Sequence, residues 1–293
     1  MSDALAVDKR MLRRSFEQAA ATYDAAAVLQ NEVCRRMLAR LDYIKLEPAT
    51  ILDAGSGTGN AVAGLLARYS RARVVALDLA LAMARRARAR RSWWRGLFER
   101  RGPRLAAVCG DLEQLPLAPA CAGMVWSNLA IQWSNEPQRA FAEMHRVLVP
   151  GGLLLFSSFG PDTLKELRAA FQSVDRHTHV HRFTDMHDVG DLLVACGFAD
   201  PVMDMEVVTL TYDDVKGLMR DLKAIGAHNM TRGRPSALAG KSLLAKVARN
   251  YEPARREGRL PATFEVIYGH AWKPAPRVGP TGRPVIDIKP RSG

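Results

Sequence analysis

The chain has 293 residues, of which 48% are hydrophobic and 25% charged, and this ordinary composition excludes a disordered, collagenous or coiled-coil protein. No apolar run approaches the roughly 18–20 residues that span a bilayer, and the start of the chain lacks the continuous apolar core of a signal peptide. Four cysteines without a CxxC pair favour reduced thiols over a disulfide framework or a zinc site. We therefore expect a cytoplasmic protein.

Positive charge is concentrated in two stretches of the chain, whose formal net charge is +12. Nine arginines against one glutamate occupy residues 85–104, and residues 273–293 carry the whole of the remaining excess, so that the rest of the chain is formally neutral. A localised basic patch indicates docking of an acidic macromolecule at one edge of the protein. A solvated basic helix end followed by a disordered tail is the alternative interpretation.

The first half of the chain predicts strands that alternate with helices. Residues 9–46 have helical spacing, and five buried strands are expected over residues 49–54, 73–78, 105–111, 123–128 and 153–158. Helices are expected between them over residues 60–69, through Met83, and from Pro137 to the Pro-Gly-Gly sequence at 150–152. This alternation predicts an α/β fold with a doubly wound, mostly parallel sheet.

Beyond residue 160 the pattern changes. Helices are expected over residues 161–174, 186–196, 215–225 and 236–250, a polar loop over 177–183, and strands over 203–211 and 264–270. The total is seven strands, with helices inserted among the last of them as a cap. We expect an N-terminal helical segment (1–46), a ligand-binding core (47–160), the remaining strands with the helical cap (161–272) and a basic disordered tail (273–293).

The sequence Asp53-Ala-Gly55-Ser-Gly57-Thr-Gly59 follows the first strand and opens a helix. Its glycines let the backbone turn tightly and approach a ligand without an intervening Cβ. Asp78 ends the next strand, where a carboxylate can accept from both hydroxyls of a ribose. A dinucleotide-binding dehydrogenase is the obvious rival, but the Asp53 carboxylate would repel a pyrophosphate and hold an ammonium group.

This arrangement resembles the class I S-adenosylmethionine-dependent methyltransferases. The resemblance implies that Asp53 meets the methionine amino group, the three glycines face the methionyl moiety, and Asp78 holds the ribose. Asp111 would accept from the adenine amine, Met83 would be the apolar adenine contact, and Asn128 would lie beside the methyl group. The cofactor set implied in full is Tyr23, Gln30, Asp53, Gly55, Gly57, Gly59, Asp78, Leu79, Met83, Asp111, Leu112 and Asn128.

Further segments are similar to the malonyl-[acyl-carrier protein] O-methyltransferase family of biotin synthesis. They are FEQAAATYD at 16–24, DLEQLPL at 111–117, WSNLAIQW at 126–133, AFQSVD at 170–175, LKAIGA at 222–227 and GRLPAT at 258–263. The resemblance covers residues 12–272, including the cap. It implies methylation of the free carboxylate of a malonyl thioester on acyl-carrier protein, with S-adenosylmethionine as the methyl donor.

The resemblance also implies roles for residues around the substrate. Because a malonyl carboxylate is already ionised near pH 7, we expect no general base and no single catalytic residue. Tyr23 and Asn128 would position the reactants, and Tyr23 with Gln30 would fold over the cofactor. Tyr23 and Phe183 would line the entrance for the pantetheine arm, and Arg182 or a histidine of the 177–183 loop would pair with the substrate carboxylate.

Acyl-carrier protein is acidic, so a basic docking face is expected. Arg90, Arg91 and Arg95 are the residues predicted to supply it, and Lys165, Arg168 and Arg182 are rivals nearer the expected mouth. We expect no metal, because no acidic side chain other than Asp185 and Asp188 flanks the histidines at 177, 179, 181 and 187. No membrane partner is expected, nucleic acid is a weak candidate, and a monomer is expected.

Three other functions remain open from the sequence. The segment at 159–168 also resembles a methyltransferase-fold protein arginine hydroxylase that assists assembly of respiratory complex I. The pI near 10.0 suggests an RNA methyltransferase, although only Trp93, Trp94 and Phe98 offer stacking platforms within the arginine-rich stretch. A binding protein with a silent cofactor site is the third.

Overall fold

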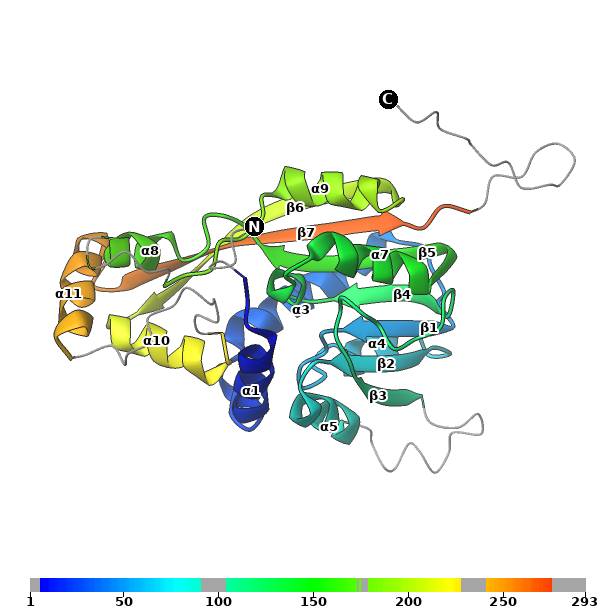
Figure 1. The fold of residues 1–293 in the computed structure, drawn as a ribbon, viewed down its shortest axis with the longest axis horizontal. Coiled ribbons are helices and arrows are strands. Elements are labelled where there is room, and N and C mark those ends of the chain that lie inside the picture. The colour runs from blue at the N-terminus through cyan, green and yellow to red at the C-terminus, as the bar shows by residue number, and fades with distance from the viewer. Residues whose placement is uncertain (1–5, 91–103, 173, 175–178, 228–240, 276–293) are drawn as a thin grey trace, which may run out of the picture.

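The structure, a computed structural model, describes residues 6–90, 104–172, 174, 179–227 and 241–275. Within these residues, seven strands form one sheet in the order β3-β2-β1-β4-β5-β7-β6 (Figure 1). The strands are β1 (Thr50–Ala54), β2 (Arg73–Asp78), β3 (Leu105–Cys109), β4 (Ala122–Ser127), β5 (Leu148–Phe159), β6 (Ala199–Tyr212) and β7 (Leu260–Trp272). The predicted doubly wound, mostly parallel seven-stranded sheet is therefore confirmed.

Strands β1 to β5 pair in parallel, and β7 runs antiparallel to both β5 and β6. The strand order reverses at β1, which lies between β2 and β4. In open α/β sheets, the carboxyl ends of the strands at such a switch point are where ligands bind. The glycine-containing segment that follows β1 therefore begins at this switch point.

Helices cover both faces of the sheet. They are α1 (Lys9–Ala19), α2 (Tyr23–Ala26), α3 (Val28–Arg40), α4 (Val62–Arg68), α5 (Leu81–Ala89), α7 (Pro137–Val147), α8 (Lys165–Gln172), α9 (Met186–Ala195), α10 (Val215–Ala224) and α11 (Lys241–Tyr251). On β1, Ile51 packs with residues of α3 and α4, whereas Leu52 packs with residues of α7 and α9. Both faces of the central parallel strands are therefore buried, which explains their continuous apolar runs, whereas the edge strand β3 is partly exposed.

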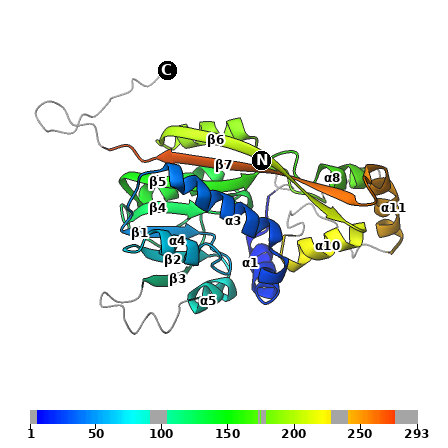
Figure 2. The same cartoon turned by 180° about the vertical axis from the view of Figure 1, so that it is seen from behind.

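Strands β6 and β7, with 14 and 13 residues, are much longer than β1 to β4, which have five or six, and their far ends carry the cap. Figures 1 and 2 show β6 and β7 extending past the parallel strands, with α8, α10 and α11 gathered at their ends. Leu167 of α8, Leu218 of α10 and Val247 of α11 are buried in the same apolar cluster as Phe264 of β7. The predicted insertion of helices among the last strands is thus realised as one packed unit.

Several predicted boundaries differ from the structure: β6 and β7 are each longer than predicted, β3 ends two residues earlier, and the ends of three helices also differ. Helix α7 ends at Val147 and β5 begins at Leu148, so the Pro-Gly-Gly sequence starts the strand instead of separating it from the helix. Helix α8 begins at Lys165, because Leu164 has a φ of 55° that no α-helix accommodates. Helix α11 begins at Lys241, and residues 236–240 of the predicted helix lie outside the described residues.

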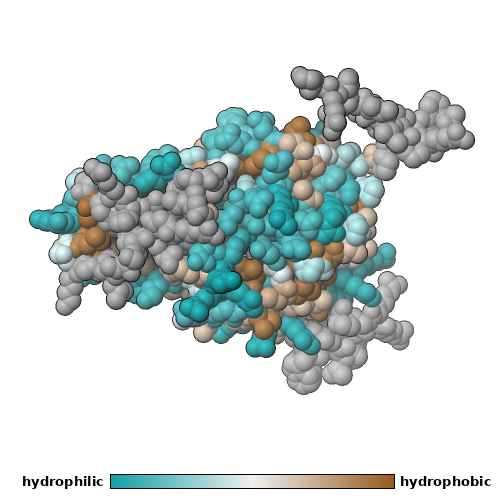
Figure 3. All heavy atoms as spheres, in the orientation of Figure 1, coloured by the Kyte–Doolittle hydropathy of each residue, from teal (hydrophilic) through white to brown (hydrophobic). Residues whose placement is uncertain are grey.

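Charged and polar residues dominate the visible surface. On the face shown in Figure 3, hydrophobic residues form small, separate patches among hydrophilic ones. Within the described part of the chain, no helix is long and apolar enough to cross a membrane.

Candidate functional site

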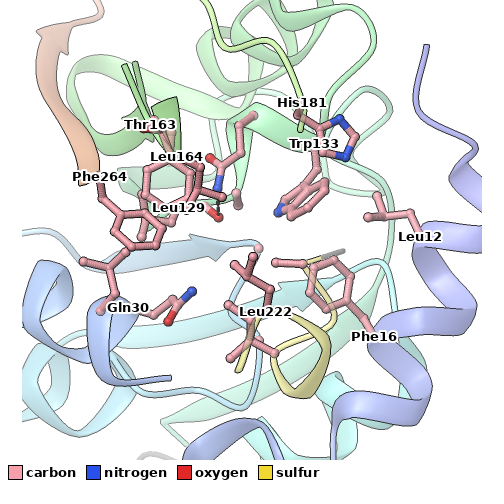
Figure 4. Close-up of a pocket in the computed structure, with 18 of the residues that line it drawn as sticks. Leu12, Phe16, Gln30, Leu129, Trp133, Thr163, Leu164, His181, Leu222 and Phe264 are labelled. Atoms are coloured by element: carbon pink, nitrogen blue, oxygen red, sulfur yellow. Dashed lines mark hydrogen bonds between the residues drawn. The ribbon is translucent and has the colours of Figure 1, made fainter. Parts of the chain in front are cut away.

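A cavity of about 630 Å³ lies at the carboxyl ends of the parallel strands and continues beneath the cap. One half of it, here called the cofactor half, is lined by residues that follow β1, β2, β3 and β4, together with α1 and α2. The other, here called the acceptor half, is lined by β5, α8, the 179–183 loop, β6, α10 and β7. Figure 4 shows Phe264 and Leu164 on one side of the hollow, Trp133 and His181 on another, and Phe16 and Leu222 opposite them.

The glycine turn after β1 forms the floor of the cofactor half. Gly55 and Gly57 line the cavity with φ values of 81° and 54°. A Cβ on Gly55 would lie 2.2 Å from the Cβ of Ala130, so no larger residue fits there. Gly59 also has a positive φ, but its missing Cβ makes room for Ala87 of α5, and it does not line the cavity. The structure thus brings two of the three predicted glycines into the site.

Asp78, the last residue of β2, binds the backbone of the same glycine turn. Its Oδ2 accepts from the backbone N–H of Gly57 at 2.9 Å, and its Oδ1 accepts from that of Ala80 at 2.8 Å. Burial raises the pKa of Asp78 to about 6, although these two backbone donors lower it. The carboxylate is thereby fixed at the cavity wall with a defined orientation, beside the lining residues Leu79 and Met83.

Asp53 lies at the end of β1, is 2% exposed and does not itself line the cavity. Its Oδ2 has no hydrogen-bond partner among the described residues. Burial raises the pKa of Asp53 to about 8, with the neighbouring Asp78 adding to the shift. A buried carboxylate oxygen without a donor is costly, and a cation bound beside it would remove that cost. This unpaired acceptor, buried directly behind the glycine turn, therefore fits an amino-acid ammonium group bound at the turn.

Lys9 is a site residue that the sequence did not reveal. Its Nζ donates to Oδ1 of Asp111 at 2.9 Å and lies 3.0 Å from Oε1 of Glu113. Asp111 and Leu112 line the cavity as predicted positions, but the Asp111 carboxylate already accepts from Lys9. No local signal predicts a contact between residues 102 positions apart.

The N-terminal segment also fixes α5 at the edge of the cavity. Glu17 accepts from the backbone N–H groups of Leu81 and Ala82 at 2.7 and 2.9 Å. These are free donors of the first turn of α5, so a carboxylate from α1 caps a second helix. Met83 then packs with Phe16 and Tyr23 in a small apolar cluster. Burial raises the pKa of Tyr23, so its hydroxyl stays protonated at neutral pH.

Asn128 is committed to internal hydrogen bonds. Its Nδ2 donates to the carbonyl of Gln30 at 3.0 Å, and its Oδ1 accepts from Ser157 Oγ at 2.9 Å. Asn128 therefore ties the start of α3 to β5, and it lines the cavity itself. The Oε1 of Gln30 is buried in the cavity wall with no partner among the described residues (Figure 4).

The acceptor half is apolar and rich in aromatic rings. Phe159 contacts Phe183 and Phe264 with ring centroids 5.5 and 5.8 Å apart. His181, which is 9% exposed, packs edge-on against Trp133 at 5.2 Å. Of the described lining residues, those that are exposed and so mark the mouth are Val28, Thr209, Thr211 and Asp221.

The predicted substrate and docking residues are only partly brought to this site. Phe183 lines the acceptor half, whereas Arg182 is exposed and lies outside the lining. Arg90 bonds to the glycine turn and to α2 instead of being free for a partner. Arg91 and Arg95 lie outside the described residues.

Comparison with known proteins gives concordant results. Residues 52–156 match a family model described as a methyltransferase domain. The chain is 58% identical to a malonyl-[acyl-carrier protein] O-methyltransferase of Gallionella capsiferriformans over 96% of each chain. It is 56% identical to a protein of the same name from Methylovorus sp. over 99% of this chain and 98% of the other.

Solved structures share the fold at low identity. The YcgJ protein of Bacillus subtilis has a TM-score of 0.56 and 14% identity over 82% of this chain and 99% of its own. A phosphoethanolamine N-methyltransferase of Haemonchus contortus, solved with S-adenosyl-L-methionine, has a TM-score of 0.50 and 18% identity over 88% of this chain and 57% of its own. These likenesses concern the fold alone.

Proposed function

The chain belongs to the malonyl-[acyl-carrier protein] O-methyltransferase family, and from this premise we propose the reaction that it catalyses. It transfers the methyl group of S-adenosylmethionine to the free carboxylate of a malonyl group that acyl-carrier protein holds as a thioester. The single observation that carries the proposal is identity of 54–58% to four curated relatives of that name along nearly the whole chain. The arginine hydroxylase and the RNA methyltransferase are not favoured.

The cofactor half has the groups that such a methyl donor needs. Bound there, S-adenosylmethionine supplies a methyl group that is activated by the positive sulfonium to which it is attached. Gly55 and Gly57 leave room for the methionyl chain, Asp53 offers the carboxylate for its ammonium group, and Asp78 offers one for the ribose. Tyr23 covers the turn, with its ring carbon 3.8 Å from the position that a Cβ on Gly57 would occupy.

The acceptor half supports carboxylate methylation by excluding water. Its aromatic walls strip solvent from the malonyl oxygen, which raises its reactivity toward a methyl group. Alignment of the two reactants contributes the rest, because no proton has to move before the oxygen attacks. Tyr23 and Phe183 position the acyl chain. Arg182, one of the residues predicted to pair with the carboxylate, is exposed, whereas the adjacent His181 is buried in the cavity wall.

The basic face of α10 is where we place acyl-carrier protein. Lys216, Arg220 and Lys223 recur at helical spacing, are exposed and carry no ion pair among the described residues. The opposite face of the same helix lines the acceptor half, and Asp221 marks its mouth. A carrier held on this face would have its pantetheine arm beside the entrance.

The test is to incubate the purified protein with methyl-labelled S-adenosylmethionine and malonyl-acyl-carrier protein. Base-labile label on the carrier, absent when acetyl-acyl-carrier protein replaces it, is the expected result. Cofactor binding without label on the carrier would overturn the proposed reaction. Methylation of free malonyl-coenzyme A at equal efficiency would overturn the docking role of α10.

A further inference from the structure

Arg90, at the end of α5, makes more directed hydrogen bonds than a solvated surface arginine. Its Nε donates to the carbonyl of Thr58 at 2.6 Å. One terminal nitrogen donates to Oδ2 of Asp24 at 2.9 Å and to Oδ1 of Asn60 at 2.7 Å. Arg90 therefore joins three segments: α5, the glycine turn and α2.

The contacts extend from this arginine to α3. Thr58 Oγ1 donates to the other oxygen of Asp24, and Asn60 donates through Nδ2 to Oδ1 of Asn31 at 2.6 Å. Two residues of the glycine turn thus hold one residue of α2 and one of α3. Bonds to a charged partner are stronger than neutral ones, so the contacts of Asp24 contribute most.

These bonds fasten the part of the chain that covers the cofactor half. Tyr23 precedes Asp24 directly and lies over Gly57 in the cavity wall. Helix α2 has only four residues and no side-chain N-cap, so it has little stability of its own. On its other side, Thr22 Oγ1 donates to the carbonyl of Ala224 at the end of α10. The cover is held at two points, to the glycine turn and to the cap.

We propose that the Arg90–Asp24 ion pair is a latch that holds residues 22–31 over the bound cofactor and sets how fast cofactor and product leave. Arg90 is accordingly a positioning residue, and it acts through Asp24 and Tyr23. The proposal rests on the proposed function for the identity of the ligand, S-adenosylmethionine or its demethylated product. It replaces the docking role predicted for Arg90, whose Nε and one terminal nitrogen already donate to the protein.

The experiment compares Arg90→Ala and Asp24→Ala with Arg86→Ala, an exposed arginine one turn earlier on α5 that has no ion pair among the described residues. The dissociation rate and Kd of S-adenosylhomocysteine are measured by stopped-flow fluorescence and calorimetry without any acceptor. We expect both latch variants to release it roughly tenfold faster, since losing a charge-assisted pair amounts to about that factor. Arg86→Ala should match the unmodified protein.

Three further readouts separate a latch from a merely structural or docking role. The KM for S-adenosylmethionine should rise in Arg90→Ala while the KM for malonyl-acyl-carrier protein stays unchanged and the Tm of the ligand-free protein falls by only a few degrees. The double variant should lose clearly less than the sum of the two single losses, because the Arg90–Asp24 contact is removed in both, and only the separate bonds of each residue to Thr58 and Asn60 add. An unchanged dissociation rate, or a raised KM for the carrier alone, would overturn the latch. Failure of the proposed reaction would instead appear as normal ligand release without label on the carrier.

Discussion

The two halves of the cavity are built in different ways. The cofactor half is held by short turns at the ends of parallel strands, where backbone N–H groups and carboxylates such as Asp78 meet at fixed distances. The acceptor half is assembled from long antiparallel strands and separate helices, and its walls are mostly hydrocarbon. The first kind of site depends on particular residues at particular positions, whereas the second depends on volume and shape. Substitutions should therefore have sharper effects in the first.

The largest effect is expected for Gly55→Ala. The new Cβ would overlap that of Ala130, and the alanine backbone would have to keep a φ of 81° that alanine rarely adopts. We expect affinity for S-adenosylhomocysteine to fall about a hundredfold or more in calorimetry. Gly151→Ala is the matched control, because its φ is 77° but no atom lies within 4 Å of the new Cβ. Equal losses in both variants would show that backbone strain, and not the close approach, is responsible.

Asp53→Asn should change both the stability of the free protein and the affinity for the cofactor in a pH-dependent way. The raised pKa of about 8 means that the folded protein keeps a proton on Asp53 which the unfolded chain loses near pH 4. Stability of the free protein therefore falls as pH rises from about 4 to 8, and Asp53→Asn should raise the Tm at pH 8 but hardly at pH 4.

Ionisation of Asp53 has opposite effects on stability and on binding: it lowers the stability of the free protein but raises the affinity for the cofactor. An ammonium group favours the ionised carboxylate, so affinity should increase with pH up to about 8 in the unmodified protein. In Asp53→Asn the affinity should be flat above about pH 7, where Asp78, with a pKa of about 6, is already ionised. We expect a loss of about tenfold at pH 8. A pH slope that persists in the variant would assign the titration to another group.

Phe183→Ala is expected to have a smaller effect, and one that falls on the acceptor substrate instead of the cofactor. Removing a ring that packs on Phe159 widens the acceptor half and should raise the KM for malonyl-acyl-carrier protein about tenfold. The Kd for S-adenosylhomocysteine should not change, which separates the two halves. Phe183→Leu should have a KM for malonyl-acyl-carrier protein between those of the unmodified protein and Phe183→Ala, because leucine retains most of the side-chain volume. An equal loss of cofactor affinity would show that the halves are coupled.

The smallest effect is expected at the surface. Reversing the charges of Lys216, Arg220 and Lys223 on α10 should raise the KM for the carrier several-fold at low salt, and the difference should shrink as salt screens it. The control reverses Arg85, Arg86 and Arg88 on α5, beside the arginine-rich stretch. A larger effect of the α5 variant would return the docking role to residues 85–104.

The cofactor half could be predicted from the sequence because its residues are local. Asp53, Gly55 and Gly57 fall within five positions, Asp78 is the last residue of β2, and Asp111 follows the end of β3 by two positions. The ends of parallel neighbouring strands meet at one edge of the sheet, so position in the chain determines position in space. The same logic failed for Gly59, since nothing in the spacing distinguishes a glycine that faces a ligand from one that makes room for Ala87.

The acceptor half and the charged contacts could not be predicted in this way. Whether Phe183 or the adjacent Arg182 faces the cavity depends on how a loop packs against Phe159 and Trp133, which are distant in sequence. Arg90 is one of nine arginines in its stretch, and only its contacts with Asp24 and Thr58 set it apart. A basic residue at a helix end looks the same in sequence whether it binds a partner or its own protein.

The sequence by itself determined the order of strands and helices, the doubly wound sheet, the glycine turn and the family, because apolar periodicity and short motifs act over a few neighbouring residues. Tertiary structure alone decided the contact of Lys9 with Asp111, the capping of α5 by Glu17, the latch at Arg90 and the depth of the acceptor half. Each of these joins residues that are 64 or more positions apart or lie on different elements, and such contacts exist only once the chain has packed.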